Sequence, residues 1–259
     1  MKILITGAAG FIGFHAVKHY AELGYRVVGL DNLNDYYDVD LKYARLDLTG
    51  IDRSHIRNHQ AVKSSVYPNY KFYKADILDK VFIDKLFSCE QFDFICHLAA
   101  QAGVRYSLEN PYTYVQSNVV GFLNILEACR QHPVKHLVYA SSSSVYGLNR
   151  KVPFQESDQV DTPVSLYAAS KKSNELMAHT YSNSYGIPST GVRFFTVYGP
   201  WGRPDMAPYL FMDSVMKRIP INVYNSGNLS RDFTFIDDVV EALSCIVAHA
   251  PEEEIPYRI

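Results

Sequence analysis

The chain has 259 residues, of which 47% are hydrophobic and 20% charged, and its formal net charge is −2. This length supports one large domain, and the small net charge gives no bulk attraction to nucleic acid or to an anionic membrane. No apolar run reaches membrane-spanning length and no signal-peptide pattern opens the chain, and the four cysteines have no metal-type spacing, so we expect a reduced, cytoplasmic protein.

The first stretch of the chain has the pattern of a dinucleotide-binding unit. An apolar run at 3–5 predicts a buried strand, Gly7–Gly13 supplies three glycines before a helical pattern, and a second strand at 26–30 ends at Asp31. The glycines let the backbone approach a pyrophosphate, and the helix N-terminus offers N–H groups to the phosphates. Asp31 is placed to bond the ribose hydroxyls and to repel a 2′-phosphate. Since no Arg or Lys follows at 32 or 33, the pattern predicts NAD rather than NADP.

The remaining elements alternate strands with helices. After Asp31 the chain turns polar, residues 40–50 look helical, and 52–68 have no clear period. Beyond these, the patterns predict strands at 70–74, 93–97, 135–141 and 189–195, and helices at about 79–88, 112–131 and 165–185. This alternation requires an α/β fold, a doubly wound parallel Rossmann sheet with helices on both faces. The final residues, IPYRI, have the composition of a strand.

Two further stretches carry reactive side chains. Ser141–Gly147 follows the strand at 135–141, at the sheet edge where ligands bind in doubly wound folds. Tyr167 and Lys171 lie one turn apart on a predicted helix and share a face. A tyrosine with a pKa of ~10 is a poor base at neutral pH, and a neighbouring ammonium favours the phenolate. We interpret Tyr167 as an acid/base and Lys171 as its tuner; the alternative is an amphipathic helix with a core tyrosine and a surface lysine.

These features together resemble an extended short-chain dehydrogenase/reductase of the NAD-dependent epimerase/dehydratase family. Three long strings are similar to UDP-glucuronate 4-epimerases: DNLNDYYD at 31–38, AQAGVRYSLENP at 100–111 and RFFTVYGPWGRPDMA at 193–207. The resemblance implies NAD-dependent 4-epimerisation of a UDP-uronic acid, UDP-glucuronate to UDP-galacturonate, through a transient 4-keto intermediate. It also implies a UDP-sugar as the substrate, a homodimer paired through the helices at 112–131 and 165–185, and no nucleic-acid or membrane partner.

The resemblance also implies roles for individual residues. The catalytic residues are expected to be Tyr167, Lys171 and Ser142, the last by its spacing before Tyr167. The cofactor-binding residues are expected to be Gly7, Gly10, Phe11, Ile12, Gly13, Asp31, Asn32, Asp76, Ile77, Ala99, Ala100 and Lys171. The substrate-binding residues are expected to be Ser142, Ser143, Thr196, Arg203 and Arg231. Arg231 is assigned to the diphosphate, and Thr196 and Arg203 to the sugar carboxylate, which a planar guanidinium suits. No metal is expected.

The expected domains are an NAD-binding Rossmann domain, 1–193 with 235–259, and a partial substrate-binding domain, 194–234. Family chains continue past the position matching Ile259, so the resemblance indicates a C-terminally shortened member whose activity is open. The alternatives are another nucleotide-sugar epimerase, a dehydratase or decarboxylase of the same family, and a truncated, non-catalytic NAD-binding protein. The dehydratases and decarboxylases carry acidic residues after the position matching Ser142, where this chain has Ser143 and Ser144.

Several weaker candidates have a structural interpretation. His15 and His19 have the spacing of a metal pair but no third ligand, so we expect a solvated helix face. His97 ends a core strand and is expected to be a satisfied structural histidine. Asn118 is a candidate for bridging backbone near the site, and Cys96 lies in an apolar pattern as a core thiol.

Overall fold

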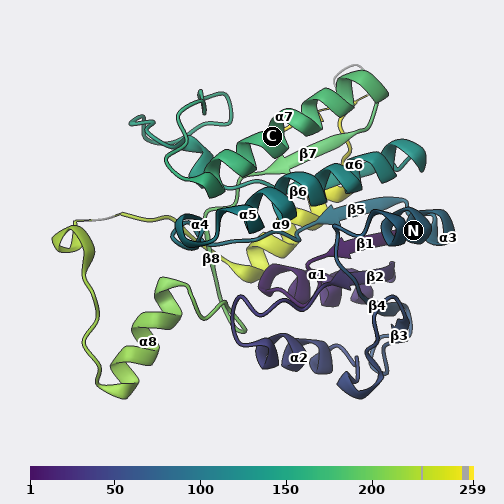
Figure 1. Ribbon diagram of the computed structural model, residues 1–259, viewed down its shortest axis with the longest axis horizontal. Helices are drawn as coiled ribbons and strands as arrows, with labels where there is room; N and C mark the ends of the chain where they lie inside the picture. Colours follow the sequence, from purple (N-terminus) through teal and green to yellow (C-terminus); the bar gives the residue numbers. More distant parts are fainter. Residues whose placement is uncertain (229, 253–256) are drawn as a thin grey trace.

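A computed structural model describes residues 1–228, 230–252 and 257–259 (Figure 1). The strands are β1 (Lys2–Thr6), β2 (Arg26–Asp31), β3 (Ala61–Lys63), β4 (Tyr70–Lys74), β5 (Phe94–His97), β6 (His136–Ala140), β7 (Ser189–Val192), β8 (Thr196–Tyr198), β9 (Phe233–Phe235) and β10 (Tyr257–Arg258). The α-helices are α1 (Phe11–Glu22), α2 (Val39–Leu48), α3 (Lys80–Glu90), α4 (Tyr106–Glu109), α5 (Pro111–Tyr114), α6 (Gly121–Gln131), α7 (Leu166–Tyr185), α8 (Ala207–Lys217) and α9 (Ile236–Ala248). Short helical segments are η1 (Arg53–His55), the π-helix η2 (Val115–Val120), η3 (Ser143–Tyr146) and η4 (Tyr224–Gly227).

The predicted doubly wound sheet is confirmed. Its eight strands lie in the order β10-β7-β6-β5-β1-β2-β4-β3, and every neighbouring pair is parallel except β3 with β4. Successive strands are added outward in both directions from β1 and β5, so the topological switch lies between these two strands. Ligands bind at the carboxyl ends of the strands at such a point.

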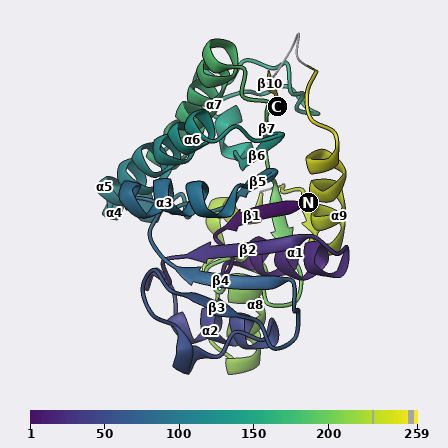
Figure 2. The same ribbon diagram turned by 90° about the vertical axis from the view of Figure 1, so that its right-hand side faces the viewer.

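Helices cover both faces of the sheet. Figure 2 shows α3, α6 and α7 on one face and α1 and α9 on the other. The alternation within β1 explains how each face is filled: Ile3 and Ile5 pack in the cluster that includes α1 and α9, whereas Leu4 packs in the cluster that includes α3, α6 and α7. Strands that bury both faces have continuous apolar sequences, which is why β1 was recognisable.

Most predicted elements agree with the structure to within a few residues, and two differ in kind. The region 52–68 contains η1 and β3, which the sequence did not predict, because β3 is short and buries only Val62. The predicted helix at 112–131 is divided into α5, the π-helix η2 and α6. The strand expected at the chain's end is present as β10, which pairs with β7; residues 253–256 lie outside the described residues.

Residues 194–234 are arranged differently from the main sheet. They contain β8 and α8, and β9, which spans the boundary of this segment, pairs with β8 in a separate two-stranded ribbon. Figure 1 shows α8 projecting away from the sheet, whereas α9 packs against α1 and β6. The division at 193 and 235 stays a prediction. In the described part of the chain, no helix combines the length and apolar character needed to cross a membrane.

Candidate active site

The glycine turn lies at the topological switch of the sheet. Gly7 adopts a φ of +71°, and a Cβ there would lie 2.9 Å from the backbone nitrogen of Ala99. The ends of β1 and β5 therefore lie so close together that only glycine fits at this position. A Cβ on Gly13 would meet the Gly7 carbonyl at 2.0 Å. The helix α1 starts at Phe11 with Gly10 as its N-cap, and no side chain caps its first amides. This leaves a cradle that fits a pyrophosphate.

Acidic and amide side chains gather where β2 and β4 end. The Asp31 carboxylate accepts hydrogen bonds from the backbone nitrogens of Ala9 at 3.1 Å and Leu33 at 2.8 Å. Asn32 Nδ2 donates to Asp76 Oδ2 at 2.9 Å, which joins the two strand ends. The sequence did not connect Lys42 to this cluster, but α2 places its Nζ 3.9 Å from Asp31. This cluster fits the ribose and adenine end of a dinucleotide.

Ile77 and Ala100 complete the predicted cofactor wall. Ile77 is buried, its carbonyl accepts from Asn124 at 2.9 Å, and a Cβ on Gly121 would lie 2.5 Å from its side chain. Ala100 follows Ala99 beyond the end of β5. Ile12 lies in the first turn of α1. The structure therefore brings the predicted cofactor residues other than Lys171 to the carboxyl ends of β1, β2, β4 and β5.

Tyr167 stands at the start of α7 beside the end of β6. Burial is the largest influence on the pKa of Tyr167 and raises it, while a hydrogen bond from Ser142 and the charge of Arg203 act in the opposite direction. Ser142 is buried and accepts a hydrogen bond from the Ser144 nitrogen at 3.2 Å. The backbone N–H of Ser143 donates a hydrogen bond to the carbonyl of Phe194, in the segment that follows β7. A phenol and a hydroxyl in contact are the groups required to exchange a proton with an alcohol.

Lys171 is buried one turn after Tyr167, and its Nζ donates to the Ala140 carbonyl at 2.8 Å. Burial lowers the pKa of Lys171 to about 8. Its predicted effect on Tyr167 stays a prediction. Of the cations in the described residues, Arg203 is the one whose charge acts on the pKa of Tyr167, a connection that the sequence did not reveal.

Asn118 bridges backbone near Tyr167, as expected. Its Oδ1 accepts from the Gln101 nitrogen at 2.8 Å, and its Nδ2 donates to the Gln101 carbonyl at 3.0 Å and to Ser170 Oγ at 3.0 Å. In return, the Asn118 carbonyl accepts a hydrogen bond from Asn174 Nδ2 at 2.5 Å. Asn118 lies within the π-helix η2, a type of irregularity that is frequent at functional sites. The network ties α7 to the loop that follows β5.

The predicted substrate residues are brought together only in part. Thr196 begins β8, opposite Phe233 of β9, and is half-buried. Arg231 lies two positions before Phe233, but it is exposed and donates to the carbonyl of its neighbour Ser230. Arg203 is within electrostatic reach of Tyr167 and is paired with Asp205. The diphosphate role of Arg231 therefore stays a prediction.

Arg45 is a buried residue of the site that the sequence did not reveal. Its guanidinium is 0% exposed and donates to the Ala9 carbonyl at 3.0 Å, the Trp201 carbonyl at 2.7 Å and the Tyr37 hydroxyl at 2.7 Å. One sequence signal could have identified Arg45: it follows Lys42 by one turn of the helix predicted at 40–50, so the two cations share a helix face, and in the structure that face is the buried one. Arg45 joins the glycine turn to the segment that carries Arg203.

The weaker candidates resolve as structural residues, with one correction. His97 Nδ1 lies 2.8 Å from Thr6 Oγ1, and burial lowers the pKa of His97 to about 3, so it is a neutral core histidine as expected. Cys96 is a buried free thiol. The face that we expected to be solvated is only partly so: His15 and His19 are both half-buried, and His15 Nε2 lies 3.0 Å from the Pro200 carbonyl. Within the described residues, no cluster of His, Cys, Asp or Glu is arranged for a metal ion.

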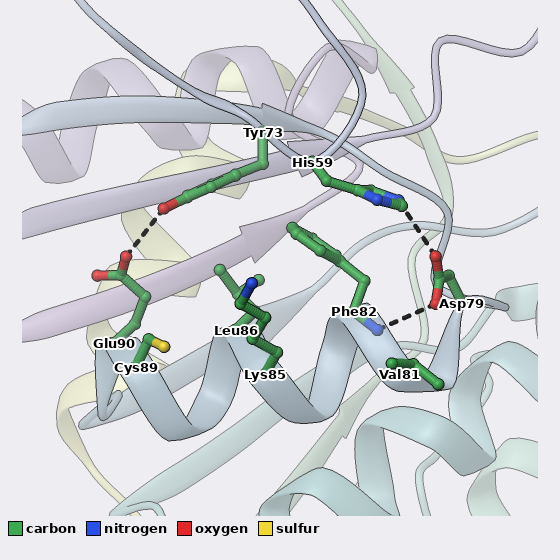
Figure 3. A pocket seen from close by; sticks show the side chains of 9 residues that line it. All are labelled: His59, Tyr73, Asp79, Val81, Phe82, Lys85, Leu86, Cys89 and Glu90. Atoms are coloured by element: carbon green, nitrogen blue, oxygen red, sulfur yellow. Dashed lines mark hydrogen bonds and ion pairs between the residues drawn. The ribbon is translucent and has the colours of Figure 1, made fainter.

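A pocket of about 370 Å³ lies away from these residues, between α3 and the outer strands (Figure 3). Four of its polar side chains are already paired: His59 Nε2 lies 3.1 Å from Asp79 Oδ2, and Tyr73 donates to Glu90 at 3.0 Å. It includes none of the predicted site residues, so the reaction chemistry belongs to the strand ends instead.

Comparisons with known proteins agree with this geometry. The model of the NAD dependent epimerase/dehydratase family matches residues 3–259. Protein CapI of Staphylococcus aureus is 54% identical over 247 residues, covering 95% of this chain and 69% of that protein. A probable UDP-glucuronate 4-epimerase of Rhizobium meliloti is 48% identical over 254 residues, covering 98% of this chain and 70% of that protein. The crystal structure of the Bacillus cereus UDP-glucuronic acid 4-epimerase with UDP-glucuronic acid and NAD has a TM-score of 0.85 at 32% identity, covering 100% of this chain and 76% of that chain.

Proposed function

Because this chain belongs to the NAD-dependent epimerase/dehydratase family, we propose that it is an NAD-dependent epimerase that interconverts UDP-glucuronate and UDP-galacturonate at C4. The observation that carries the proposal is the position of Arg203, whose guanidinium lies over the Tyr36 ring at 6.0 Å and whose charge favours the phenolate of Tyr167. A uronic acid bound with its 4-hydroxyl at Tyr167 would have its C6 carboxylate close to this guanidinium. The glycine turn and Asp31 fit the pyrophosphate and ribose of NAD.

The chain's own residues manage the proton and the position of the sugar. When bound, NAD supplies reversible hydride chemistry at C4, so that the sugar passes through a 4-ketone. Tyr167 takes the proton of the 4-hydroxyl and returns it to the 4-oxygen after the sugar has presented its other face. Ser142 donates a hydrogen bond to the same oxygen, and Lys171 holds the nicotinamide ribose. Arg203 and Thr196 hold the carboxylate while the ring turns.

The direct test is incubation of the NAD-loaded protein with UDP-glucuronate, followed by NMR for the galacturonate epimer. We expect the epimer in the parent protein and its absence in the Tyr167→Phe variant, which keeps the ring but loses the acid/base group. Failure of the parent protein to form epimer, despite bound NAD and measurable UDP-glucuronate binding, would contradict the proposal and favour a non-catalytic NAD-binding protein.

We also propose a homodimer formed through η2, α6 and α7. Figure 2 shows α6 and α7 on the same face of the sheet, and three apolar side chains there are exposed: Val120 by 43%, Leu123 by 37% and Leu176 by 57%. Met177, the next residue after Leu176, instead packs against the core. We expect a dimer by light scattering at micromolar concentration and a monomer for Leu123→Arg/Leu176→Arg. A monomeric parent protein would contradict the proposal.

We further propose a cytoplasmic location. All four cysteines are free thiols, and Cys96 and Cys129 are buried in the core, which suits a reducing compartment. Recovery of the native protein in the cytoplasmic fraction of its source cells is the expected result, and recovery from an oxidising compartment would contradict it.

A further inference from the structure

The guanidinium of Arg203 is held along one edge by a carboxylate of the same chain. Arg203 Nε donates to Asp205 Oδ1 at 2.9 Å, and Nη2 donates to Asp205 Oδ2. Planar guanidinium groups offer two such edges for bidentate contact with a carboxylate, one formed by Nε and Nη2 and one formed by Nη1 and Nη2. Asp205 takes the first edge.

The second edge of Arg203 is available to a ligand. Among residues 1–228, 230–252 and 257–259, no acceptor receives a hydrogen bond from Nη1, and the Arg203 side chain retains 23% exposure. Burial disfavours the charged form of both groups, but their mutual hydrogen bonds and charges outweigh it, so the pKa of the Asp205 carboxyl is lowered, the pKa of Arg203 is raised, and both groups are ionised at neutral pH. The pair is therefore preformed, with one edge satisfied and one edge open.

Tyr36 fixes Asp205 from the other side. Its hydroxyl donates to Asp205 Oδ2 at 3.0 Å, and its ring centre lies 6.0 Å from the Arg203 guanidinium carbon. Burial raises the pKa of Tyr36 to about 12, which keeps it a donor. The ring packs on Tyr106, with centroids 5.0 Å apart, and a Cβ on Gly103 would lie 2.2 Å from the Tyr36 hydroxyl. Only glycine at 103 leaves room for Tyr36 in this position.

Three separate strings of the sequence therefore meet at Arg203. Tyr36 belongs to the string at 31–38, Gly103 and Tyr106 to the string at 100–111, and Arg203 and Asp205 to the string at 193–207. The proposed epimerase mechanism assigns no role to Tyr36 or Asp205, and their contacts around Arg203 suggest one.

We propose that Asp205 and Tyr36 are specificity-determining positioning residues, which hold Arg203 by one edge so that its other edge binds the C6 carboxylate of a uronic acid. The inference rests on the proposed function, since it takes the substrate to be a UDP-uronic acid. Preorganisation strengthens binding of the carboxylate: an arginine side chain that is already ordered loses little conformational entropy when the ligand binds, whereas an unrestrained side chain would lose more. Neutral UDP-hexoses carry no carboxylate at C6 and gain nothing from it.

The test measures binding of UDP-glucuronate and of UDP-glucose to the NAD-loaded protein by calorimetry. For Asp205→Asn, which keeps the shape but removes the charge, we expect UDP-glucuronate binding to weaken about tenfold, the scale of one charge-assisted contact. We expect UDP-glucose binding to stay within a factor of about two. KM for UDP-glucuronate should rise with kcat changed less than about threefold, because uniform binding is lost rather than transition-state contact.

Three further variants define the mechanism. Tyr36→Phe removes the hydroxyl alone and should weaken UDP-glucuronate binding in the same direction but less, while Asp205→Glu should restore part of the loss seen in Asp205→Asn. Asp213→Asn is the matched control, because Asp213 pairs with Lys217 on exposed α8 and should change neither affinity. Unchanged circular dichroism and thermal midpoint show that each variant is folded.

The outcomes separate this inference from the proposed function. A parent protein that prefers UDP-glucuronate, with Asp205→Asn and Tyr36→Phe retaining the full preference, overturns the positioning role and leaves the epimerase proposal standing. Tighter UDP-glucuronate binding by Asp205→Asn also overturns it, since Asp205 would then be a competitor of the substrate. A parent protein that binds both sugars equally overturns the inference and the uronate assignment together.

Discussion

At the scale of single residues, we expect cofactor choice to be set by Asp31, which the fold pairs with a buried lysine. The sequence showed an acid with no adjacent cation, but the fold places Lys42 Nζ 3.9 Å from Asp31, and both side chains are buried. Burial is the main influence on the pKa of Lys42 and lowers it, while Asp31 acts in the opposite direction. We expect the Asp31 carboxylate to repel a 2′-phosphate, which favours NAD, while Lys42 offsets part of that repulsion.

Replacement of Asp31 tests this arrangement. In Asp31→Ala the repulsion is removed and Lys42 is left to attract the 2′-phosphate, so we expect NADP affinity to rise about tenfold or more relative to NAD. Fluorescence titration with both cofactors measures the ratio. The double variant Asp31→Ala/Lys42→Met should lose this gain. Equal affinities for NAD and NADP in the parent protein would show that Asp31 does not discriminate.

Tyr167 is the residue on which we expect the chemistry to depend most. We expect Tyr167→Phe to lower kcat by about 10²–10⁴, the usual contribution of a positioned acid or base. NAD affinity should be unchanged, because the phenol is not among the cofactor contacts. Stopped-flow or NMR rates together with a cofactor titration separate the two effects, and a variant with near-parent kcat would transfer the acid/base role to another group.

Lys171 predicts a pH dependence of stability. Its pKa falls from an ordinary value of 10.5 to about 8 in the folded chain, because the ammonium is buried. Between these values the unfolded chain binds a proton that the folded chain does not, so the free energy of unfolding rises with pH across this window. The contribution of Lys171 is lost as the pH falls through 8. We expect Lys171→Met to be more stable than the parent protein near pH 7.5, with an advantage that shrinks by about 2 kcal/mol at pH 9.5.

Urea unfolding of both proteins at the two pH values gives this difference, and groups that titrate equally in both cancel. A stability difference that is independent of pH would show that Lys171 is protonated alike in folded and unfolded chains. The same variant should bind NAD more weakly, since the nicotinamide ribose loses its expected partner.

At the scale of elements, α2 is a bridge between the two halves of the site. Its Arg45 is fully buried and donates to carbonyls of the glycine turn and of Trp201, which itself has a φ of +62°. Removing the guanidinium leaves these acceptors without donors in the interior. We expect Arg45→Met to cost roughly 2–5 kcal/mol of unfolding free energy.

Arg45→Met should also weaken NAD and UDP-glucuronate binding together, because the contacts of Arg45 join the two subsites. Denaturant unfolding and two ligand titrations make the measurement. The exposed Arg53, which pairs with Asp40 on the surface, supplies the control variant Arg53→Met, with an expected effect below about 1 kcal/mol. Loss of stability with both affinities intact would restrict Arg45 to a packing role.

The sequence predicted elements whose signals are local. The Gly7–Gly13 turn, the helix that carries Tyr167 and Lys171, and the buried strand β1 are each defined by spacing within a few residues. The contacts of Arg45 with Trp201 and of Tyr36 with Asp205 join positions far apart in the chain, and packing alone determines them. For the same reason β3 escaped notice, since its pairing with β4 supplies what its own pattern lacks.

At the scale of the whole molecule, stability is distributed unevenly between the sheet and α8. None of the residues Ala207–Lys217, all within the described part of the chain, is buried, and Figure 1 shows the helix standing away from the sheet. Large apolar side chains are exposed there, among them Leu210 by 49%, Phe211 by 47% and Met212 by 66%. An isolated helix of this length is marginal in water, because nucleation is costly and tertiary packing normally supplies most of its stability.

Hydrogen exchange should therefore separate α8 from the rest of the fold. In the 259-residue chain at low concentration we expect α8 amides to exchange with an opening free energy below about 2 kcal/mol, whereas those of α1, which buries Ala16, Val17 and Tyr20 in the core, approach the global value. Because exposed apolar surface favours association, the measurement is repeated at high concentration, where protection confined to α8 would identify it as a contact between copies.

Phe211→Ser should leave the unfolding free energy within about 0.5 kcal/mol, since it removes no buried contact. Protection of α8 equal to that of α1 at low concentration would mean that this helix is held by contacts within its own chain, and α8 would then have to be counted with the packed core.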